Sequence, residues 1–242
     1  KITAMVRGQA VLEAIGAELR VLGNGVPYDQ SNFQIGENTL SDVTVTYPIQ
    51  VANATAANLP FRLNETGEVY LLTADFNPGL SSSFNLTSTE GLEANDPIYL
   101  SNSVVGGDDG LYGEISSVNH STSQVTLKAG FIYSPDAQFH MGTICERVPV
   151  ITYNSAEDGS GITRDAGLGT VTMAKNSTME VEYLRYDGAV LSLPLTANNL
   201  IEDLRRIRIT IRVTSDKKLS DGSTYVATVS QAYSLRNLNY LF

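Results

Sequence analysis

The sequence predicts an α+β fold, in which an N-terminal amphipathic helix packs on an antiparallel β-sheet that carries a small inserted β-module. Three observations lead to this prediction. Apolar residues recur at helical spacing over residues 1–22, an alternation of period two dominates the chain after Pro27, and short apolar runs cluster at about 90–150. The chain is therefore divided into a helical segment, 1–26, and a β-rich head, 27–242, with the β-module inserted at about 90–150.

The helical segment has a single apolar stripe. Met5, Leu12 and Leu19 are seven residues apart, and Ile15 falls between them at three- and four-residue offsets, which is the spacing of one helix face. The glycines and the proline at 23–27 end the helix, because glycine releases a helix end and proline cannot continue it. The stripe predicts that one face of the helix lies on a sheet.

Strands are predicted wherever apolar and polar residues alternate. The clearest case is 206–213, where Ile207, Ile209 and Ile211 alternate with arginine and threonine. Asp187 and Gly188, between two apolar arms, predict a tight hairpin turn. The remaining predicted strands are 43–51, 97–100, 113–118, 124–127, 148–153 and 224–234.

Composition excludes several classes of protein. The chain has 242 residues, of which 42% are hydrophobic, so it is long and apolar enough to bury a core. Its net charge of −10 disfavours nucleic acid as a partner. A single cysteine excludes an intramolecular disulfide and a cysteine-rich zinc site, and two histidines leave little material for acid–base chemistry near pH 7. The sequence contains no apolar run long enough to span a membrane.

We predict that the chain is not an enzyme and has no small-molecule substrate. It lacks a Gly-x-Ser-x-Gly elbow, a His-Glu-x-x-His helix, a phosphate-binding glycine loop and any Cys/His cluster. His140 and Cys145 could form a nucleophilic pair, but no third group that would orient the base is evident. A pair of carboxylates acting on a glycosidic bond stays an open alternative, because such a pair is defined by its geometry.

No metal or cofactor is predicted, with calcium as an open alternative. Asp108, Asp109 and Glu114 lie in or beside a glycine-rich segment, and calcium favours clustered carboxylates on a flexible turn. Their spacing is not that of an EF-hand loop, and Asp/Gly pairs are also ordinary turn residues.

Two groups of residues have both a structural and a binding interpretation. Arg206, Arg208 and Arg212 lie opposite the isoleucine face of their strand. They either pair with acids of the same chain or contact an acidic neighbouring subunit, for which arginine is well suited. The 12 tyrosines either pack in the sheets or stack on sugars.

Five short motifs, in the right order, resemble those of PilW-like minor type IV pilins and of the minor pseudopilins of type II secretion. The motifs are AIGAELR with its exit GNGVP at 14–27, NDPIYL at 95–100, YLRYDG at 183–188, LRRIRITIRV at 204–213 and SLRNL at 234–238. Members of this family begin with a short leader, a phenylalanine and a transmembrane helix with a glutamate at its fifth position, which this sequence does not contain.

The resemblance implies a structural role. Residues 1–26 would be the C-terminal half of a pilin spine helix, and an apolar half-helix of about 20 residues would precede Lys1. An uncapped helix start and a basic first residue agree with that expectation. The β-rich head would belong to a minor pilin at the tip, or in the priming complex, of a type IV pilus. The implied partners are other pilins and minor pilins, together with the inner membrane through the missing half-helix.

The same resemblance implies a place in the bacterial cell envelope, first in the inner membrane and then in an extracellular or periplasmic filament. We expect the contacts between subunits to involve the helix stripe and the arginine row. These residues are Met5, Leu12, Ile15, Leu19, Arg206, Arg208 and Arg212. Two alternatives stay open: a minor pseudopilin of type II secretion, and a secreted adhesin or carbohydrate-binding β-module.

Overall fold

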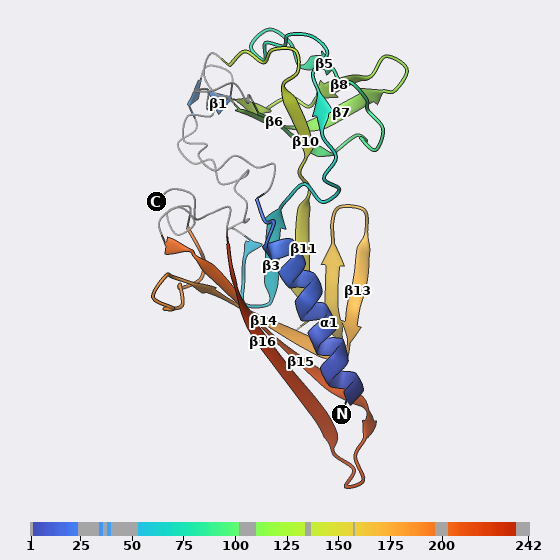
Figure 1. The fold of residues 1–242 in the computed structure, drawn as a ribbon, viewed down its shortest axis with the longest axis vertical. Coiled ribbons are helices and arrows are strands. Elements are labelled where there is room, and N and C mark those ends of the chain that lie inside the picture. The colour runs from blue at the N-terminus through green and yellow to red at the C-terminus, as the bar shows by residue number, and fades with distance from the viewer. Residues whose placement is uncertain are drawn as a thin grey trace. The chain divides into compact units, whose positions relative to one another are not determined.

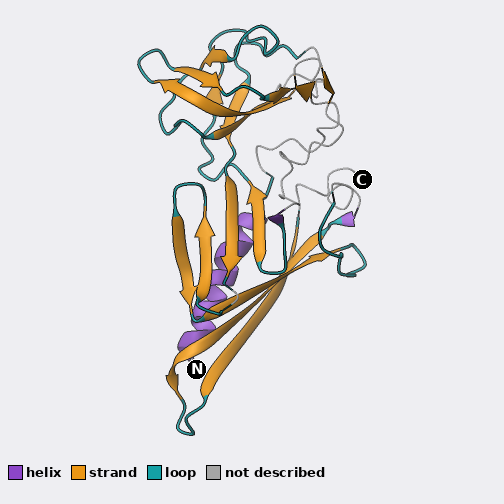
Figure 2. Ribbon diagram, turned by 180° about the vertical axis from the view of Figure 1, so that it is seen from behind, coloured by secondary structure: helices purple, strands orange, loops and turns teal. Residues whose placement is uncertain are grey.

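The protein is mostly β. The computed structural model describes residues 2–23, 34–35, 38–39, 53–101, 110–133, 137–156, 158–196 and 203–235. Of the structure, 48% is strand and 11% is helical, and one α-helix is present among the described residues (Figures 1 and 2). The predicted α+β class is therefore wrong. Several strands are only two or three residues long, so no alternation could reveal them in the sequence.

The chain forms two compact units. The first unit contains residues 1–24, 48–62 and 150–242, and the second contains residues 25–47 and 63–149. The β-module that the sequence places at about 90–150 corresponds to the later part of the second unit. Each unit has its own sheets, so the two are described separately.

The first unit contains the helix α1 (Ile2–Leu19) and two antiparallel sheets. One sheet has four strands in the order β13-β12-β11-β3, and the other has three in the order β14-β15-β16. The strands are β3 (Asn58–Arg62), β11 (Val150–Ser155), β12 (Gly161–Asp165), β13 (Thr170–Lys175), β14 (Ser177–Leu184), β15 (Arg206–Lys218) and β16 (Thr224–Ser234). Strand β14 contacts β11 and β12, which joins the two sheets.

The three-stranded sheet follows the alternation in the sequence. In β15, Ile207, Ile209 and Ile211 are fully buried, and the arginines between them lie on the other face. Strand β16 has the bounds predicted from the sequence. The predicted tight turn at 187–188 is present: the Gly188 N–H donates to the carbonyl of Arg185, and the Leu191 N–H donates to that of Tyr183. The returning arm is short and forms one bridge, Leu184 to Val190.

The helix lies on the three-stranded sheet, in contact with β15 and β16 (Figure 1). Its sheet-facing side includes Gly16, where a Cβ atom would lie only 2.3 Å from the ring of Tyr233. The Tyr233 hydroxyl donates a hydrogen bond of 2.7 Å to the carbonyl of Leu12. After the helix, Gly23 has a φ of +78° and donates its N–H to the carbonyl of Arg62, so the helix does not continue through this residue.

The second unit is built on a nine-stranded antiparallel sheet. Its path is β2-β1-β9-β7-β6-β10-β4, and β8 pairs with both β7 and β5. The strands are β1 (Gln34–Ile35), β2 (Asn38–Thr39), β4 (Tyr70–Leu71), β5 (Ser83–Asn85), β6 (Pro97–Ser101), β7 (Gly110–Asn119), β8 (Gln124–Leu127), β9 (Ile132–Tyr133) and β10 (Ile144–Arg147). Strands β6, β7 and β8 correspond to three strands predicted from the sequence, whereas the predicted strand at 43–51 lies outside the described residues.

The core of the second unit is apolar and partly aromatic. The ring of Phe76 lies 4.9 Å from that of Phe84 and 6.2 Å from that of Phe139, measured between centroids. Arg147 and Asp96 form an ion pair of 2.7 Å whose side chains are about nine-tenths buried. The unit therefore has its own apolar core, which is the main source of its stability, and a buried ion pair in which each charge has its partner.

Candidate functional site

The first two turns of α1 carry an apolar surface that the described residues leave uncovered. Ile2, Met5 and Val6 are 80%, 52% and 62% exposed, and we call them the exposed helix turn. Further along the same side of the helix, Gln9 and Glu13 are exposed and polar. Because residues three and four apart share a helix face, the outer face changes from apolar to polar within three turns.

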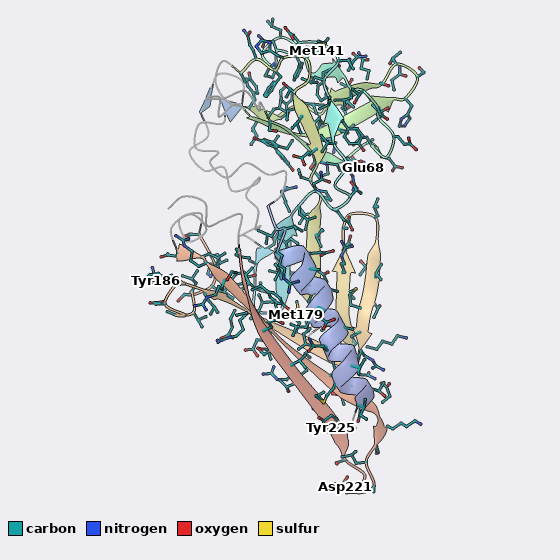
Figure 3. All side chains as sticks on the ribbon, viewed as in Figure 1. Glu68, Met141, Met179, Tyr186, Asp221 and Tyr225 are labelled. Carbon is teal, nitrogen blue, oxygen red and sulfur yellow. The ribbon has the colours of Figure 1, made fainter. Side chains whose placement is uncertain are left out.

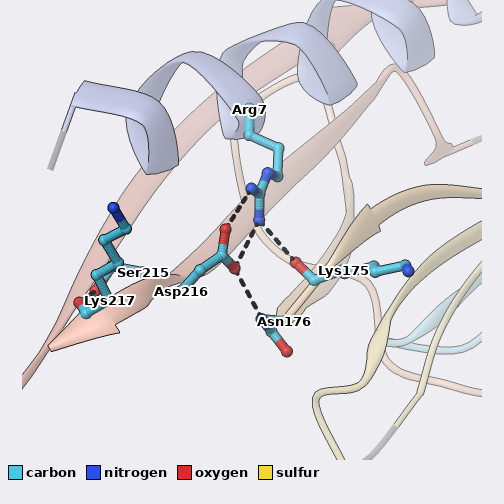
Figure 4. Close-up of polar contacts among 6 residues, drawn as sticks. All are labelled: Arg7, Lys175, Asn176, Ser215, Asp216 and Lys217. Carbon is cyan, nitrogen blue, oxygen red and sulfur yellow. Dashed lines mark hydrogen bonds and ion pairs between the residues drawn. The ribbon is translucent and has the colours of Figure 1, made fainter.

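A charged cluster beside the exposed helix turn fixes this end of the helix (Figure 4). Arg7 binds both carboxylate oxygens of Asp216, at 2.8 Å and 3.3 Å, and its Nη1 atom lies 3.5 Å from the carbonyl of Lys175. The side-chain amide of Asn176 donates to Asp216 at 3.0 Å. The Arg7 cluster, consisting of these four residues, therefore ties the helix to the end of β15 and to the connection between β13 and β14.

The cluster is charged at neutral pH. Hydrogen bonds from Arg7 and Asn176, together with the positive charge of Arg7, lower the pKa of Asp216 to about 2. In return, the hydrogen bond to Asp216 raises the pKa of Arg7. Because the pair lies at the surface, its net contribution to stability is modest, and its main effect is to orient the helix.

Two open hollows meet at Arg7. One, of about 300 Å³, is lined by Thr3, Ala4, Arg7 and residues 214–219. The other, of about 460 Å³, is lined by Arg7, Asp216 and residues 172–176. The hollows place Lys175, Lys217 and Lys218 around the first two turns of the helix.

A second polar cluster fixes the other end of the helix. Arg164 donates two hydrogen bonds, of 3.0 Å and 2.8 Å, to one carboxylate oxygen of Glu18, and the Tyr153 hydroxyl donates to the other at 2.8 Å. Burial and the charge of Glu18 raise the pKa of Tyr153, so its hydroxyl stays protonated. Since Tyr153 lies on β11 and Arg164 on β12, this cluster holds the helix on the four-stranded sheet.

Most of the predicted helix contacts are occupied within the chain. Leu12, Ile15 and Leu19 are at most 2% exposed, because they pack against the protein's own sheet. Met5 belongs to the same stripe but is half exposed. Of the predicted helix residues, Met5 is thus the one available to another subunit.

The predicted arginine row makes contacts within the chain. Arg208 forms an ion pair with Glu182, and Arg212 forms one of 3.1 Å with Glu180, both on the neighbouring strand β14. Arg206 donates to a main-chain carbonyl in the turn after β14. This arrangement matches the interpretation in which the row pairs with acids of the same chain, and it leaves less of the row for a neighbouring subunit.

The possible nucleophile Cys145 is inaccessible. Its side chain is fully buried on β10, and burial raises the pKa of the thiol, which therefore stays protonated. His140 is exposed and its ring nitrogen lies 3.4 Å from Asp75, rather than being engaged with a thiol. The pair lacks the features of an activated nucleophile.

The calcium alternative gains no ligand set. Glu114 forms an ion pair of 2.7 Å with Lys128, whereas Asp108 and Asp109 lie outside the described residues. In the part of the chain that the structure describes, no three histidine, cysteine or acidic residues are grouped as metal ligands.

The tyrosines offer little surface for stacking. Among the described tyrosines, Tyr186 alone is exposed, at 81%, in the turn after β14 (Figure 3). Tyr153, Tyr183 and Tyr233 are buried in the first unit and hold sheet and helix together. The described residues thus contain one exposed tyrosine ring rather than an aromatic platform.

No motif in the sequence predicted the Arg7 cluster or the lysines around it. Arg7 and Asp216 are 209 positions apart, so no local motif joins them. The one available signal was the adjacent pair Lys217 and Lys218, close to an Asp-Gly turn in a chain with a net charge of −10.

Comparison of the chain with protein-family models, curated proteins and solved structures finds no match. The resemblance to minor pilins therefore stays a prediction. Among the described residues, no helix has both the length and the apolar character needed to span a membrane.

Proposed function

We propose that this chain is a minor pilin, a non-catalytic structural subunit near the tip or in the priming complex of a type IV pilus. The observation that carries the proposal is the exposed helix turn, an apolar surface on a helix whose other face is fixed to the sheet. The sequence motifs that resemble minor pilins support it further.

The exposed helix turn is large enough to contribute to a contact between subunits. Fully burying a side chain of this size contributes about 1.5–3 kcal/mol. Because Ile2, Met5 and Val6 are 80%, 52% and 62% exposed, covering them would contribute roughly 3–6 kcal/mol before the losses of association are subtracted. A contact of this strength fits one among several that a subunit makes in a filament.

The rigid support of the helix favours the same role. The Arg7 cluster holds the N-terminal part of the helix, and the contacts of Glu18 with Arg164 and Tyr153 hold its last turn. In that same turn, Gly16 packs closely against Tyr233. A preordered apolar surface loses little conformational entropy when another subunit covers it.

Deletion and complementation of the gene test the proposal. Loss of the gene should reduce the number of pili seen by electron microscopy, and the wild-type chain should restore it. Val6→Asp places a charge in the exposed helix turn and should fail to restore piliation. The matched control is Leu80→Asp, because Leu80 is 86% exposed but lies in the other unit, and this variant should restore piliation. Both variants should keep the thermal unfolding midpoint of the wild type.

Other outcomes identify the alternatives. Unchanged piliation after deletion would contradict the proposal. If protein secretion stopped while pili persisted, the chain would be a minor pseudopilin. If neither process changed and the protein bound glycans through Tyr186, the adhesin interpretation would be correct.

A further inference from the structure

We propose that the N-terminal end of α1, with the ends of β13 and β15, forms a surface that binds the headgroups of an anionic phospholipid bilayer. Its cations are Lys175, Lys217 and Lys218, which we call the lysine surface. The proposal goes beyond the filament function and is tested separately from it.

The lysine surface surrounds the exposed helix turn. Lys175 is the last residue of β13, and Lys217 and Lys218 end β15. Figure 4 shows Lys175 and Lys217 on either side of the pair formed by Arg7 and Asp216. The two hollows that meet at Arg7 bring all three lysines to the first turns of the helix.

The lysines differ in their pairing from other cations of the chain. All three are exposed, and none takes part in an ion pair of the described residues. By contrast, Arg7 is held by Asp216, and Lys128 is held by Glu114. The lysine surface is therefore available for an external anion.

The local charge is positive although the chain is acidic. Asp216 is neutralised by Arg7. Two other described acids lie at this end. Asp158 is in the turn between β11 and β12, two residues before Ser160, whose carbonyl accepts the N–H of Asn176. Asp221 lies at the tip of the hairpin between β15 and β16 (Figure 3), so the three lysines exceed these two acids by one charge. There the Asp221 carboxylate accepts hydrogen bonds from Ser223. Because the whole chain has a net charge of −10, a basic end would also orient the molecule at an anionic surface.

The combination of side chains favours a bilayer over an acidic protein. Lysine carries a compact charge on a long apolar stem, which suits the boundary between headgroups and acyl chains. Ile2, Met5 and Val6 supply apolar side chains that can enter this boundary beside the lysines. The arginines that would suit forked pairing with protein carboxylates, such as Arg208 and Arg212, already pair within the chain.

Cosedimentation with vesicles tests the proposal. The full chain should bind vesicles of phosphatidylcholine mixed with phosphatidylglycerol, bind vesicles of phosphatidylcholine alone much more weakly, and dissociate as salt is raised. Each lysine near an anionic surface contributes about fivefold in affinity, so the triple variant Lys175→Gln/Lys217→Gln/Lys218→Gln should bind about 100-fold more weakly. Lys128→Gln is the matched control, because Lys128 lies in the other unit, and it should bind within about twofold of the wild type.

Two further measurements keep the test decisive. If the triple variant unfolds, the single lysine variants show whether the loss of vesicle affinity accumulates from one lysine to the next. Val6→Ser should weaken binding to vesicles without changing the dependence of binding on salt. Equal binding to both kinds of vesicle, or a triple variant that binds like the wild type, would overturn the proposal. The proposal would also be overturned if the lysine variants lost binding to an acidic partner protein but bound vesicles like the wild type. Failure to bind vesicles while Val6→Asp still abolishes piliation would refute this proposal and leave the filament function standing.

Discussion

The contact between Gly16 and Tyr233 makes an unusual prediction for a helical glycine. Replacement of glycine by alanine inside a helix ordinarily stabilises a protein by about 1 kcal/mol. At Gly16, however, the new Cβ atom would lie 2.3 Å, 2.5 Å and 2.6 Å from the Cε1, Cζ and Oη atoms of Tyr233. We therefore expect Gly16→Ala to destabilise the first unit.

The size of the destabilisation depends on how far the Tyr233 ring must move. Nonbonded carbon atoms are normally about 3.5–4.0 Å apart, so the Tyr233 ring must shift by more than about 1 Å. The ring is 4% exposed, and its hydroxyl donates to the carbonyl of Leu12, so the shift breaks a hydrogen bond worth about 1 kcal/mol. Overpacking adds about 1–3 kcal/mol, and the gain in helix propensity offsets the lost hydrogen bond. The net destabilisation should be about 1–3 kcal/mol.

Hydrogen exchange of the helix amides, followed by mass spectrometry of peptides within 2–19, measures the effect. Exchange in Gly16→Ala should be about 5- to 150-fold faster than in the wild type. Gly8→Ala is the matched control, because its Cβ atom would lie 3.2 Å and 3.3 Å from methyl groups of Val229 and Val213, which need to move only slightly. It should stay within about 1 kcal/mol of the wild type. Slower exchange in Gly16→Ala than in the wild type would refute the reasoning.

Three further outcomes are expected. Glu18→Gln should destabilise the first unit by about 1–3 kcal/mol, measured by urea unfolding, because Arg164 loses a half-buried carboxylate, and an unchanged midpoint would contradict this. Cys145 should react with a thiol reagent at pH 8 only after the protein unfolds, because its side chain is buried and its thiol stays protonated. Rapid labelling of the folded chain would show that Cys145 is not buried. The pKa of Asp216 is lowered from 3.8 to about 2, so the stability it contributes is complete above about pH 5 and is lost as the pH falls through 3.8 towards 2. An NMR titration of the Asp216 carboxyl should therefore give a pKa near 2 in the wild type and a pKa closer to 3.8 in Arg7→Gln. The same pKa in both proteins would show that the ion pair is absent.

Long strands with one buried face could be predicted from the sequence. In β15, Ile207, Ile209 and Ile211 face the core while arginines face outward, so the order of apolar and polar residues in the sequence matches the buried and exposed positions of the strand. The same pattern located β16, whose partner is β15 on one side. The helix contacts both strands, and in β15 the face opposite the buried isoleucines is polar.

The predicted fold class was wrong because several strands have no alternation of apolar and polar residues in the sequence. Strands β4 and β9 have two residues each, which is too short for any alternation. In β3, Leu59 to Arg62 are all buried, so both faces of the strand are covered and the period of two disappears. Such strands are defined by their neighbours in the sheet, and those neighbours are distant in the chain.

The candidate site shows the same division. The spacing of Met5, Leu12 and Leu19 defines a stripe on a helix, but not the surface that covers it. The sheet covers Leu12 and Leu19 and leaves half of Met5 exposed. The periodicity indicates which apolar residues share one face of the helix, whereas the burial of each residue depends on how far the sheet extends beneath the helix.

By itself, the sequence determined the helix, the longer alternating strands and the acidic character of the chain, because each depends on neighbouring residues or on their total. Tertiary structure alone decided which apolar side chains stay uncovered and which charges meet. Arg7 and Asp216 are 209 positions apart, and Glu18 and Arg164 are 146 apart. Pairs at such separations form only after the sheets bring their strands together, because no property of either residue's own segment selects its partner.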